Sequence, residues 1–136
     1  MDRIKLLDIA LFILRLAMGA IFVAHGAQKV FGLFGGPGIQ GFAGALENMG
    51  FVQPVLMAWL AGLAELIGGI LLIGGIFPRT GATMIACVMA VAAVKVHGPN
   101  GLFASNSGFE YPLLALSVAV ALAFTGGGKL SLLDRF

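Results

Sequence analysis

Charged residues are scarce in this chain. Of its 136 residues, 10% are charged and 60% are hydrophobic, and the mean hydropathy is +1.04. A soluble domain carries about a quarter charged residues, because water must solvate its surface. The scarcity of charge therefore excludes a soluble globular domain, and the hydrophobic content excludes a disordered tail. The length is that of one domain, which we place over residues 1–136.

Cysteine is almost absent as well. The single cysteine, Cys87, lies in an apolar run and can form neither an internal disulfide nor a Cys-x-x-Cys redox pair, so we interpret it as a small packing residue. The eight basic residues are spread along the chain rather than gathered into a stripe, which argues against a nucleic-acid partner. His25 and His97 are not spaced as in a zinc motif, so the sequence predicts no metal site.

The chain does contain four apolar stretches. They predict helices at approximately residues 9–30, 55–76, 80–96 and 109–126. A membrane-spanning helix needs roughly 20 residues, and the last stretch approaches this length only when its polar edges are included. Only helices and closed barrels satisfy their own backbone in lipid, and these stretches lack the alternation of strands. The sequence therefore predicts an all-α integral membrane four-helix bundle, with the lipid bilayer as its first partner.

Basic residues near the ends of the predicted helices indicate the orientation. One side carries Arg3, Lys5, Arg79, Lys129 and Arg135, and the other side carries Lys29 and Lys95. Because basic residues accumulate on the cytoplasmic side of a membrane, both termini are predicted to be cytoplasmic.

The segment between the first two helices predicts a fifth, shorter helix. Ile39, Phe42, Leu46 and Met49 recur at helical spacing, which favours an amphipathic helix at the membrane interface over an ordinary loop packed on the bundle. Residues 36–41 match the pattern G-x-G-x-x-G, but no strand precedes them. We therefore interpret them as a turn and a helix start rather than as a phosphate-binding loop.

Ionisable residues at membrane depth are costly, which makes them functional candidates. With a rise of 1.5 Å per residue, Arg15 on the first helix and Glu65 on the second are expected at similar depths. We predict that they form a structural ion pair between the helices. The alternative is that Glu65 handles protons, because burial favours the neutral form of a carboxyl group.

A second polar group is expected in the outer half of the bundle. Its members are His25, Lys29, Lys95, His97, Glu110 and Tyr111. Each has a structural explanation of its own: Lys95 reaches to the interface and Tyr111 belongs to the aromatic belt, for example. Together they predict a pocket for an anionic or quinone-like headgroup, and both interpretations stay open.

These residues also carry a resemblance to a known family. The blocks at 14–16, 25–32, 36–42, 64–69, 78–79 and 125–131 resemble the DoxX family. The most specific part is His25-Gly26-x-x-Lys29 together with Glu65 in the second helix, and the resemblance covers nearly the whole chain after the first dozen residues. The tail departs from the family pattern, since two leucines precede Asp134 where one residue is expected. Asp134 is therefore assigned no role.

The resemblance implies a bacterial inner-membrane protein with four helices, similar to oxidoreductase-like proteins linked to quinone reduction, sulfur compounds and oxidative stress. Under this hypothesis His25 and Glu65 are catalytic. His25 and Lys29 bind a quinone oxygen, and Glu65 or Glu110 relays protons. Lys95, His97, Glu110 and Tyr111 complete the ligand site.

A chain with no thiol pair and no flavin motif needs a borrowed cofactor and a partner redox protein. Quinone is the first candidate for that cofactor, and haem held between His25 and His97 is the weaker variant. Distant relatives of the family act in assembly or as cargo factors. The alternative hypothesis is therefore a non-enzymatic protein that holds a lipid, a small molecule or a partner chain.

Overall fold

The computed structural model describes residues 3–134. Over these residues the chain forms α1 (Leu6–Phe31), α2 (Gly38–Asn48), α3 (Pro54–Gly74), α4 (Pro78–Val91) and α5 (Glu110–Thr125). Short turns lie between them: η1 (Leu33–Gly35), η2 (Ala92–Val96), η3 (Gly98–Asn100) and η4 (Ala104–Asn106). The π-helical turn η2 continues α4. The described part of the chain contains no strand beyond one isolated bridge, so the prediction of an all-α bundle is confirmed.

The helices begin and end within a few residues of the predicted positions. The larger differences are at the start of α1, which begins at Leu6 rather than at residue 9, and at the end of α4, where η2 forms the last predicted residues. The helix α3 is also shorter than predicted at its end. The prediction extended this helix to residue 76, whereas it ends at Gly74. Gly75 takes the left-handed conformation at φ 62, which ends a helix, and Pro78 occupies the first turn of α4. Ile76 therefore lies in a tight turn that reverses the chain.

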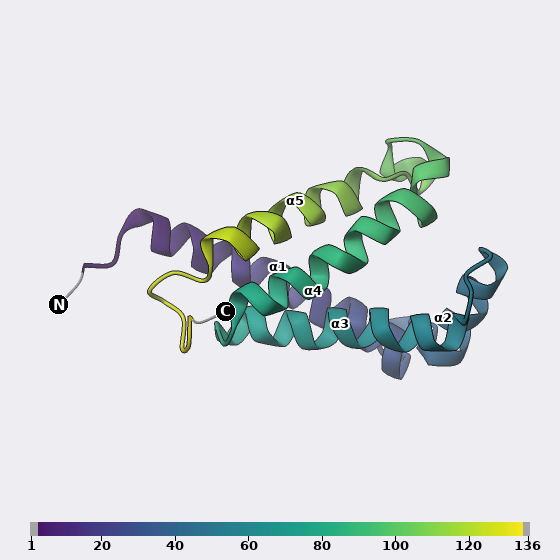
Figure 1. Cartoon of the computed structure of the whole chain (residues 1–136), viewed down its shortest axis with the longest axis horizontal. Helices are drawn as coiled ribbons and strands as arrows, with labels where there is room; N and C mark the ends of the chain where they lie inside the picture. The colour runs from purple at the N-terminus through teal and green to yellow at the C-terminus, as the bar shows by residue number, and fades with distance from the viewer. Residues whose placement is uncertain (1–2, 135–136) are drawn as a thin grey trace.

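Glycines bring the helices close together. A Cβ atom added to Gly26 of α1 would lie 2.5 Å from the backbone nitrogen of Leu66 in α3, and one added to Gly81 of α4 would lie 2.8 Å from the carbonyl oxygen of Gly68. Small residues at such crossings let helices of membrane proteins pack backbone to backbone. Figure 1 shows the result. The helices α3 and α4 meet near their connecting turn and diverge toward the other end, and α5 lies beside α4.

The apolar side chains divide into a narrow core and a broad outer surface. Phe22, Leu72, Ile85 and Leu122 are buried between the helices. Many large apolar residues instead remain exposed around the bundle, among them Ile13, Trp59, Ile70, Val94 and Leu114. A soluble monomer rarely exposes so much contiguous apolar surface. Lipid is its natural cover, and the chain is a membrane protein.

Within residues 3–134, three helical segments are long and apolar enough to cross a bilayer: Leu6–Phe31, Pro54–Gly74 and Pro78–Val96. The remaining long helix, α5, has 16 residues, which is roughly 24 Å of rise against about 30 Å of hydrocarbon. That α5 forms a fourth crossing stays a prediction.

Both ends of the described chain lie at the same end of the bundle. The backbone nitrogen of Lys129 donates to Asp8 Oδ1 at 3.0 Å, and Lys129 Nζ donates to the carbonyl oxygen of Arg3 at 3.2 Å. The turn between α3 and α4 lies there too, because Leu133 and Gly75 are hydrogen-bonded through their backbones. Arg135, which the orientation argument used, lies outside the described residues.

The predicted short helix is present as α2. Ile39, Phe42 and Leu46 face the bundle and pack near Met57 and Ala58 of α3. Met49, which the pattern placed on the same face, is instead exposed at the end of the helix. The helix is thus packed on the bundle, and its place at the membrane interface stays a prediction.

Candidate ligand site and the two cations of α1

Arg15 is enclosed at the end of the bundle where both ends of the described chain lie. Its side chain is 1% exposed, and its guanidinium is surrounded by hydrogen-bond acceptors. Nε donates to the carbonyl oxygen of Leu72, Nη2 to that of Leu130, and Nη1 to that of Gly127 and to the hydroxyl of Ser131. Leu72 lies in the last turn of α3, where a cation also interacts favourably with the helix dipole. Arg15 therefore joins α1, α3 and the C-terminal tail.

The predicted ion pair between Arg15 and Glu65 is not formed, because the register of α1 and α3 separates the two charges. Arg15 is level with Leu72, which lies seven residues beyond Glu65, or roughly 10 Å along the helix. Glu65 is next to Leu66, whose backbone meets Gly26 of α1. The prediction centred both helices at the same depth, whereas packing shifts them along each other.

Glu65 pairs with Lys29 instead. Lys29 Nζ lies 2.5 Å from Glu65 Oε1, and the glutamate is fully buried while the lysine side chain is 23% exposed. The ammonium group also lies over the ring of Phe42, 5.0 Å from its centroid. The other carboxylate oxygen, Oε2, has no hydrogen-bond partner within residues 3–134. One face of the carboxylate is thus bound to a cation, and the other lacks a donor.

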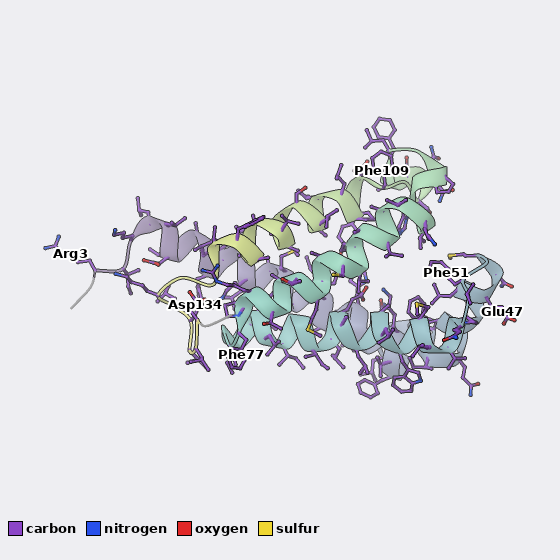
Figure 2. All side chains as sticks on the ribbon, viewed as in Figure 1. Arg3, Glu47, Phe51, Phe77, Phe109 and Asp134 are labelled. Carbon is purple, nitrogen blue, oxygen red and sulfur yellow. The ribbon has the colours of Figure 1, made fainter. Side chains whose placement is uncertain are left out.

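A cavity of about 550 Å³ lies between α2, α3 and α4, and Lys29 forms part of its wall. The rest of the wall is apolar except for His97; it includes Phe42, Leu46, Phe51, Leu60, Val88 and Val91. Pockets for small ligands commonly have about this volume and this mixture of apolar walls and few polar groups. Figure 2 shows Phe51, which lies in the segment between α2 and α3, on the side that faces α4.

The end of α4 brings two further predicted residues to this region. His97 lines the cavity, and its Nδ1 lies 2.8 Å from the carbonyl oxygen of Ser107. Since a carbonyl only accepts, Nδ1 carries the proton and Nε2 is the acceptor of the neutral ring. Lys95 is exposed, and its ammonium lies over the ring of Phe51 at 5.7 Å from the centroid. The contact between Lys95 and Phe51 therefore connects the end of α4 to the segment between α2 and α3.

His25 and Tyr111 form a separate pair on the side of α1 that faces α5. Their ring centroids are 6.0 Å apart and the rings are stacked, and Phe22 lies 6.1 Å from His25 on the next turn. His25 is not among the residues that line the large cavity. The predicted outer group is thus divided: Lys29 and His97 line the cavity, whereas His25 and Tyr111 stack on each other elsewhere.

Glu110 lies apart from this site. Its side chain is exposed, and its Oε2 accepts a hydrogen bond from the backbone nitrogen of Ala104 at 3.0 Å. The expectation that Glu110 joins the ligand site is therefore not supported by its position, because the carboxylate holds the loop before α5.

The two histidines also have different neighbours. His25 stacks on Tyr111, whereas His97 bonds to the loop at Ser107. Their contacts give no support to a haem held between them. Within the described residues no group of three or more histidine, cysteine or acidic side chains could hold a metal ion.

Sequence reasoning missed two sets of residues. The first is the apolar wall of the cavity, which looks like ordinary core in the sequence. The second is the C-terminal tail, where Gly127, Leu130 and Ser131 surround Arg15, and where Asp134 Oδ1 accepts from the backbone nitrogen of Gly127 at 3.1 Å. Asp134 thus has a structural role that was not assigned to it. The signal available was a mid-helix arginine with no carboxylate one turn away, which needs acceptors from elsewhere.

The fold and the site define a small helical membrane protein with a largely apolar cavity beside a buried ion pair. The chain belongs to the DoxX family, whose family model matches residues 10–98. It is 32% identical over 135 residues to "Putative oxidoreductase CatD" of Bacillus subtilis (strain 168), which covers 97% of this chain and 90% of that protein.

Two proteins of Haemophilus influenzae, both described as uncharacterized, are also similar to this chain. One is 31% identical over 131 residues, covering 90% of this chain and 87% of the relative. The other is 33% identical over 69 residues, covering 51% and 46%. No solved structure gives a significant match.

Proposed function

We propose that this chain is a membrane oxidoreductase, or the membrane subunit of one, that binds a quinone-like ligand in the cavity between α3 and α4. The observation that carries this proposal is the position of the Lys29–Glu65 pair. Lys29 lies in the wall of a largely apolar cavity, and Glu65 pairs with it from behind that wall. The oxidoreductase name of the Bacillus subtilis relative supports the reaction class.

The wall residues suit the two parts of such a ligand. The apolar side chains from α2, α3 and α4 suit a ring and a hydrocarbon tail. Lys29 Nζ donates to one oxygen of the headgroup, and His97 provides a second polar contact. The cavity volume lies within the range of about 300–1,000 Å³ that is typical of small-molecule sites.

Reduction of a quinone adds protons as well as electrons, and the ion pair provides the proton-handling groups. Lys29 carries protons at the cavity wall, and Glu65 holds the lysine in place from the bundle interior. His25 stacks on Tyr111 outside the cavity wall, so in this proposal it does not contact the ligand. The electrons come from a partner redox protein, since the redox group is the ligand itself.

The same cavity also suits the alternative of a non-enzymatic binding or assembly protein. Its wall is polar at only Lys29 and His97, so the tail of a lipid would fit it as well. The two functions differ in turnover and not in binding, and they are separated by measuring both.

A variant with a large side chain in the cavity tests whether the ligand binds there. Ala61 of α3 lies in the wall, and Ala61→Phe places a ring inside it. Ala121 of α5 is exposed, so Ala121→Phe is a matched control. With purified protein in lipid nanodiscs, decylubiquinone binding measured by calorimetry should weaken at least about tenfold in Ala61→Phe, or 1.4 kcal/mol, and stay unchanged in the control.

Equal binding in the two phenylalanine variants and the wild type would place the ligand elsewhere and contradict the proposal. Binding without quinone reduction under any donor would favour the alternative.

We further propose that the chain lies in a bacterial inner membrane with both termini in the cytoplasm. Arg3, Lys5, Arg79 and Lys129 gather at the end of the bundle that holds the termini, as cytoplasmic basic residues do. A reporter fused after Phe136 should be active only in its cytoplasmic form, and an exported reporter would reverse the orientation.

A further inference from the structure

The cavity between α2, α3 and α4 is open on one side. Leu60 of α3 and Val91 of α4 both line it, and these two residues are 55% and 47% exposed. Cys87 of α4 also lines it and is exposed. Figure 1 shows that α3 and α4 diverge on the side away from their connecting turn. The exposed wall residues therefore indicate an opening of the cavity between these two helices.

This opening lies at the middle of two predicted membrane crossings. Cys87 is the central residue of the apolar segment Pro78–Val96. Leu60 lies within about one helical turn of the centre of Pro54–Gly74. The hydrocarbon core of a bilayer is about 30 Å thick, so the centre of such a segment is about 15 Å from either interface. The phase that meets the opening is thus the hydrocarbon of the membrane.

The Lys29–Glu65 pair lies at the same level as the opening. A Cβ atom added to Gly68 of α3 would lie 3.0 Å from Ile85 Cγ1 of α4, so these two residues are level with each other. The two helices run antiparallel, because a tight turn joins them. Glu65 and Cys87 therefore both lie roughly 3–5 Å further from that turn. Since Glu65 Oε1 holds Lys29 Nζ, the ammonium group is reached from the hydrocarbon core.

The pair presents a hydrogen-bond donor without a net charge. The carboxylate of Glu65 neutralises the ammonium of Lys29. An anionic headgroup would meet this carboxylate behind the lysine, and it would also lose its hydration at a depth where any charge is costly. A carbonyl oxygen carries no charge and can still accept a hydrogen bond from Lys29 Nζ. The electrostatics of the wall therefore favour a neutral headgroup.

We propose that the cavity is a side entrance from the hydrocarbon core, which admits a neutral quinone-like headgroup dissolved in the membrane and excludes charged lipid headgroups. This inference rests on the proposed function, because it concerns the ligand of the same cavity. It adds the route of entry, between α3 and α4, and it selects the neutral class of ligand over the anionic headgroup that the sequence also allowed.

Cys87 is a native probe of the opening, because it is the only cysteine of the chain. A nitroxide label is attached to its thiol in lipid nanodiscs. Collisions of the label with molecular oxygen, which dissolves in hydrocarbon, are then compared with collisions with a water-soluble nickel chelate. Ala121→Cys combined with Cys87→Ser is the control, since Ala121 is exposed on α5. Oxygen should relax the label equally at both sites, and the chelate should reach neither.

A chelate that reaches a label at Cys87 but not one at position 121 would show that the cavity opens to water. This result would overturn the side entrance while leaving the cavity as a ligand site.

Protection of the free thiol tests whether the ligand uses the same opening. Decylubiquinone at about ten times its Kd leaves roughly a tenth of the sites empty, so the label reagent should react with Cys87 about tenfold more slowly. The reaction at Ala121→Cys, again with Cys87→Ser, should keep its rate. An unchanged rate at Cys87 in a protein that binds decylubiquinone would overturn the route and leave the proposed function intact.

Competition tests the charge of the headgroup. Decyl phosphate combines a tail of the same length as that of decylubiquinone with an anionic headgroup, whereas idebenone is a neutral quinone with a similar tail. Decyl phosphate should displace decylubiquinone at least about tenfold less well than idebenone does, because its charge is costly at this depth. Equal displacement would overturn the selection of neutral headgroups without contradicting quinone binding.

A wild-type protein that binds decyl phosphate and no quinone would overturn both the proposed function and the neutral class of ligand. The collision measurement would still decide whether the cavity opens to hydrocarbon, so the two failures are distinguishable.

Discussion

Arg15 and Lys29 lie on the same helix, roughly 20 Å apart along its axis, and their surroundings are opposite. Arg15 is bound by neutral backbone carbonyls and a hydroxyl at the closed end of the bundle. Lys29 is bound by a carboxylate and lies beside a cavity at the end where α3 and α4 diverge.

The difference follows from the two cations themselves. A guanidinium presents five donors in a rigid plane, so fixed backbone acceptors can satisfy it and hold three segments together. An ammonium is a compact charge on a flexible stem, and it can move between a carboxylate and a ligand. The comparison suggests that one end of the bundle provides stability and the other responds to ligand.

The largest expected effect is that of Arg15→Leu. Four buried or partly buried acceptors lose their donor at once, and we expect a loss of about 3–5 kcal/mol in the free energy of unfolding. Thermal unfolding in detergent measures it. Arg79→Leu is the control, because this exposed arginine bonds to two carbonyls near the end of α5 and should cost about 1 kcal/mol. Equal losses in the two variants would remove the special role of Arg15.

Replacing both partners of the Lys29–Glu65 pair should cost less stability than replacing Lys29 alone. Lys29→Met leaves a buried carboxylate without its cation and should cost about 3 kcal/mol. The double variant Lys29→Met with Glu65→Leu should recover most of that stability, because apolar residues of similar size often replace a buried ion pair at little cost. Ligand binding should be lost in both. A double variant as unstable as Lys29→Met would show that the pair is structural.

The contact between α1 and α3 gives a smaller effect. Gly26→Ala brings a Cβ atom within 2.5 Å of the Leu66 backbone, next to Glu65, and should cost about 1–3 kcal/mol and weaken ligand binding. Gly44→Ala in α2 is the control, since no atom lies within 4 Å of its added Cβ, and it should leave stability equal or raise it by up to about 1 kcal/mol. Unfolding and binding measured on both variants check this, and a neutral Gly26→Ala would mean that the helices can separate freely.

The smallest effect is expected for Glu110→Gln. The residue is exposed and holds only the loop at Ala104, so stability should fall by no more than about 1 kcal/mol and decylubiquinone binding should stay the same. Calorimetry measures the binding. A clear loss of affinity would return Glu110 to the ligand site and make the two ends of the bundle less distinct than they appear from their contacts.

Much of the fold was predictable from the sequence, because length and hydropathy are local properties of a segment. Long apolar runs in a chain with few charges must satisfy their backbone as helices, and glycine and proline near residues 75–78 end one helix and begin the next. The short helix before α3 was visible as well, from the spacing of Ile39, Phe42 and Leu46.

The candidate site was predictable only as a set of residue types. His25, Lys29, Glu65, His97 and Tyr111 stood out because ionisable and aromatic polar groups are rare in such a chain. The partners of Arg15 could not be found in this way, since backbone carbonyls of the C-terminal tail have no signature in the side chains.

The sequence by itself determined that this protein is helical and lies in a membrane, since those properties depend on composition along the chain. Only the tertiary structure decided that Glu65 pairs with Lys29 and not with Arg15, and that a cavity lies beside that pair. The physical reason is the register of two packed helices. It depends on where the glycines of α1 meet the backbone of α3, and a shift of seven residues moves a charge by roughly 10 Å.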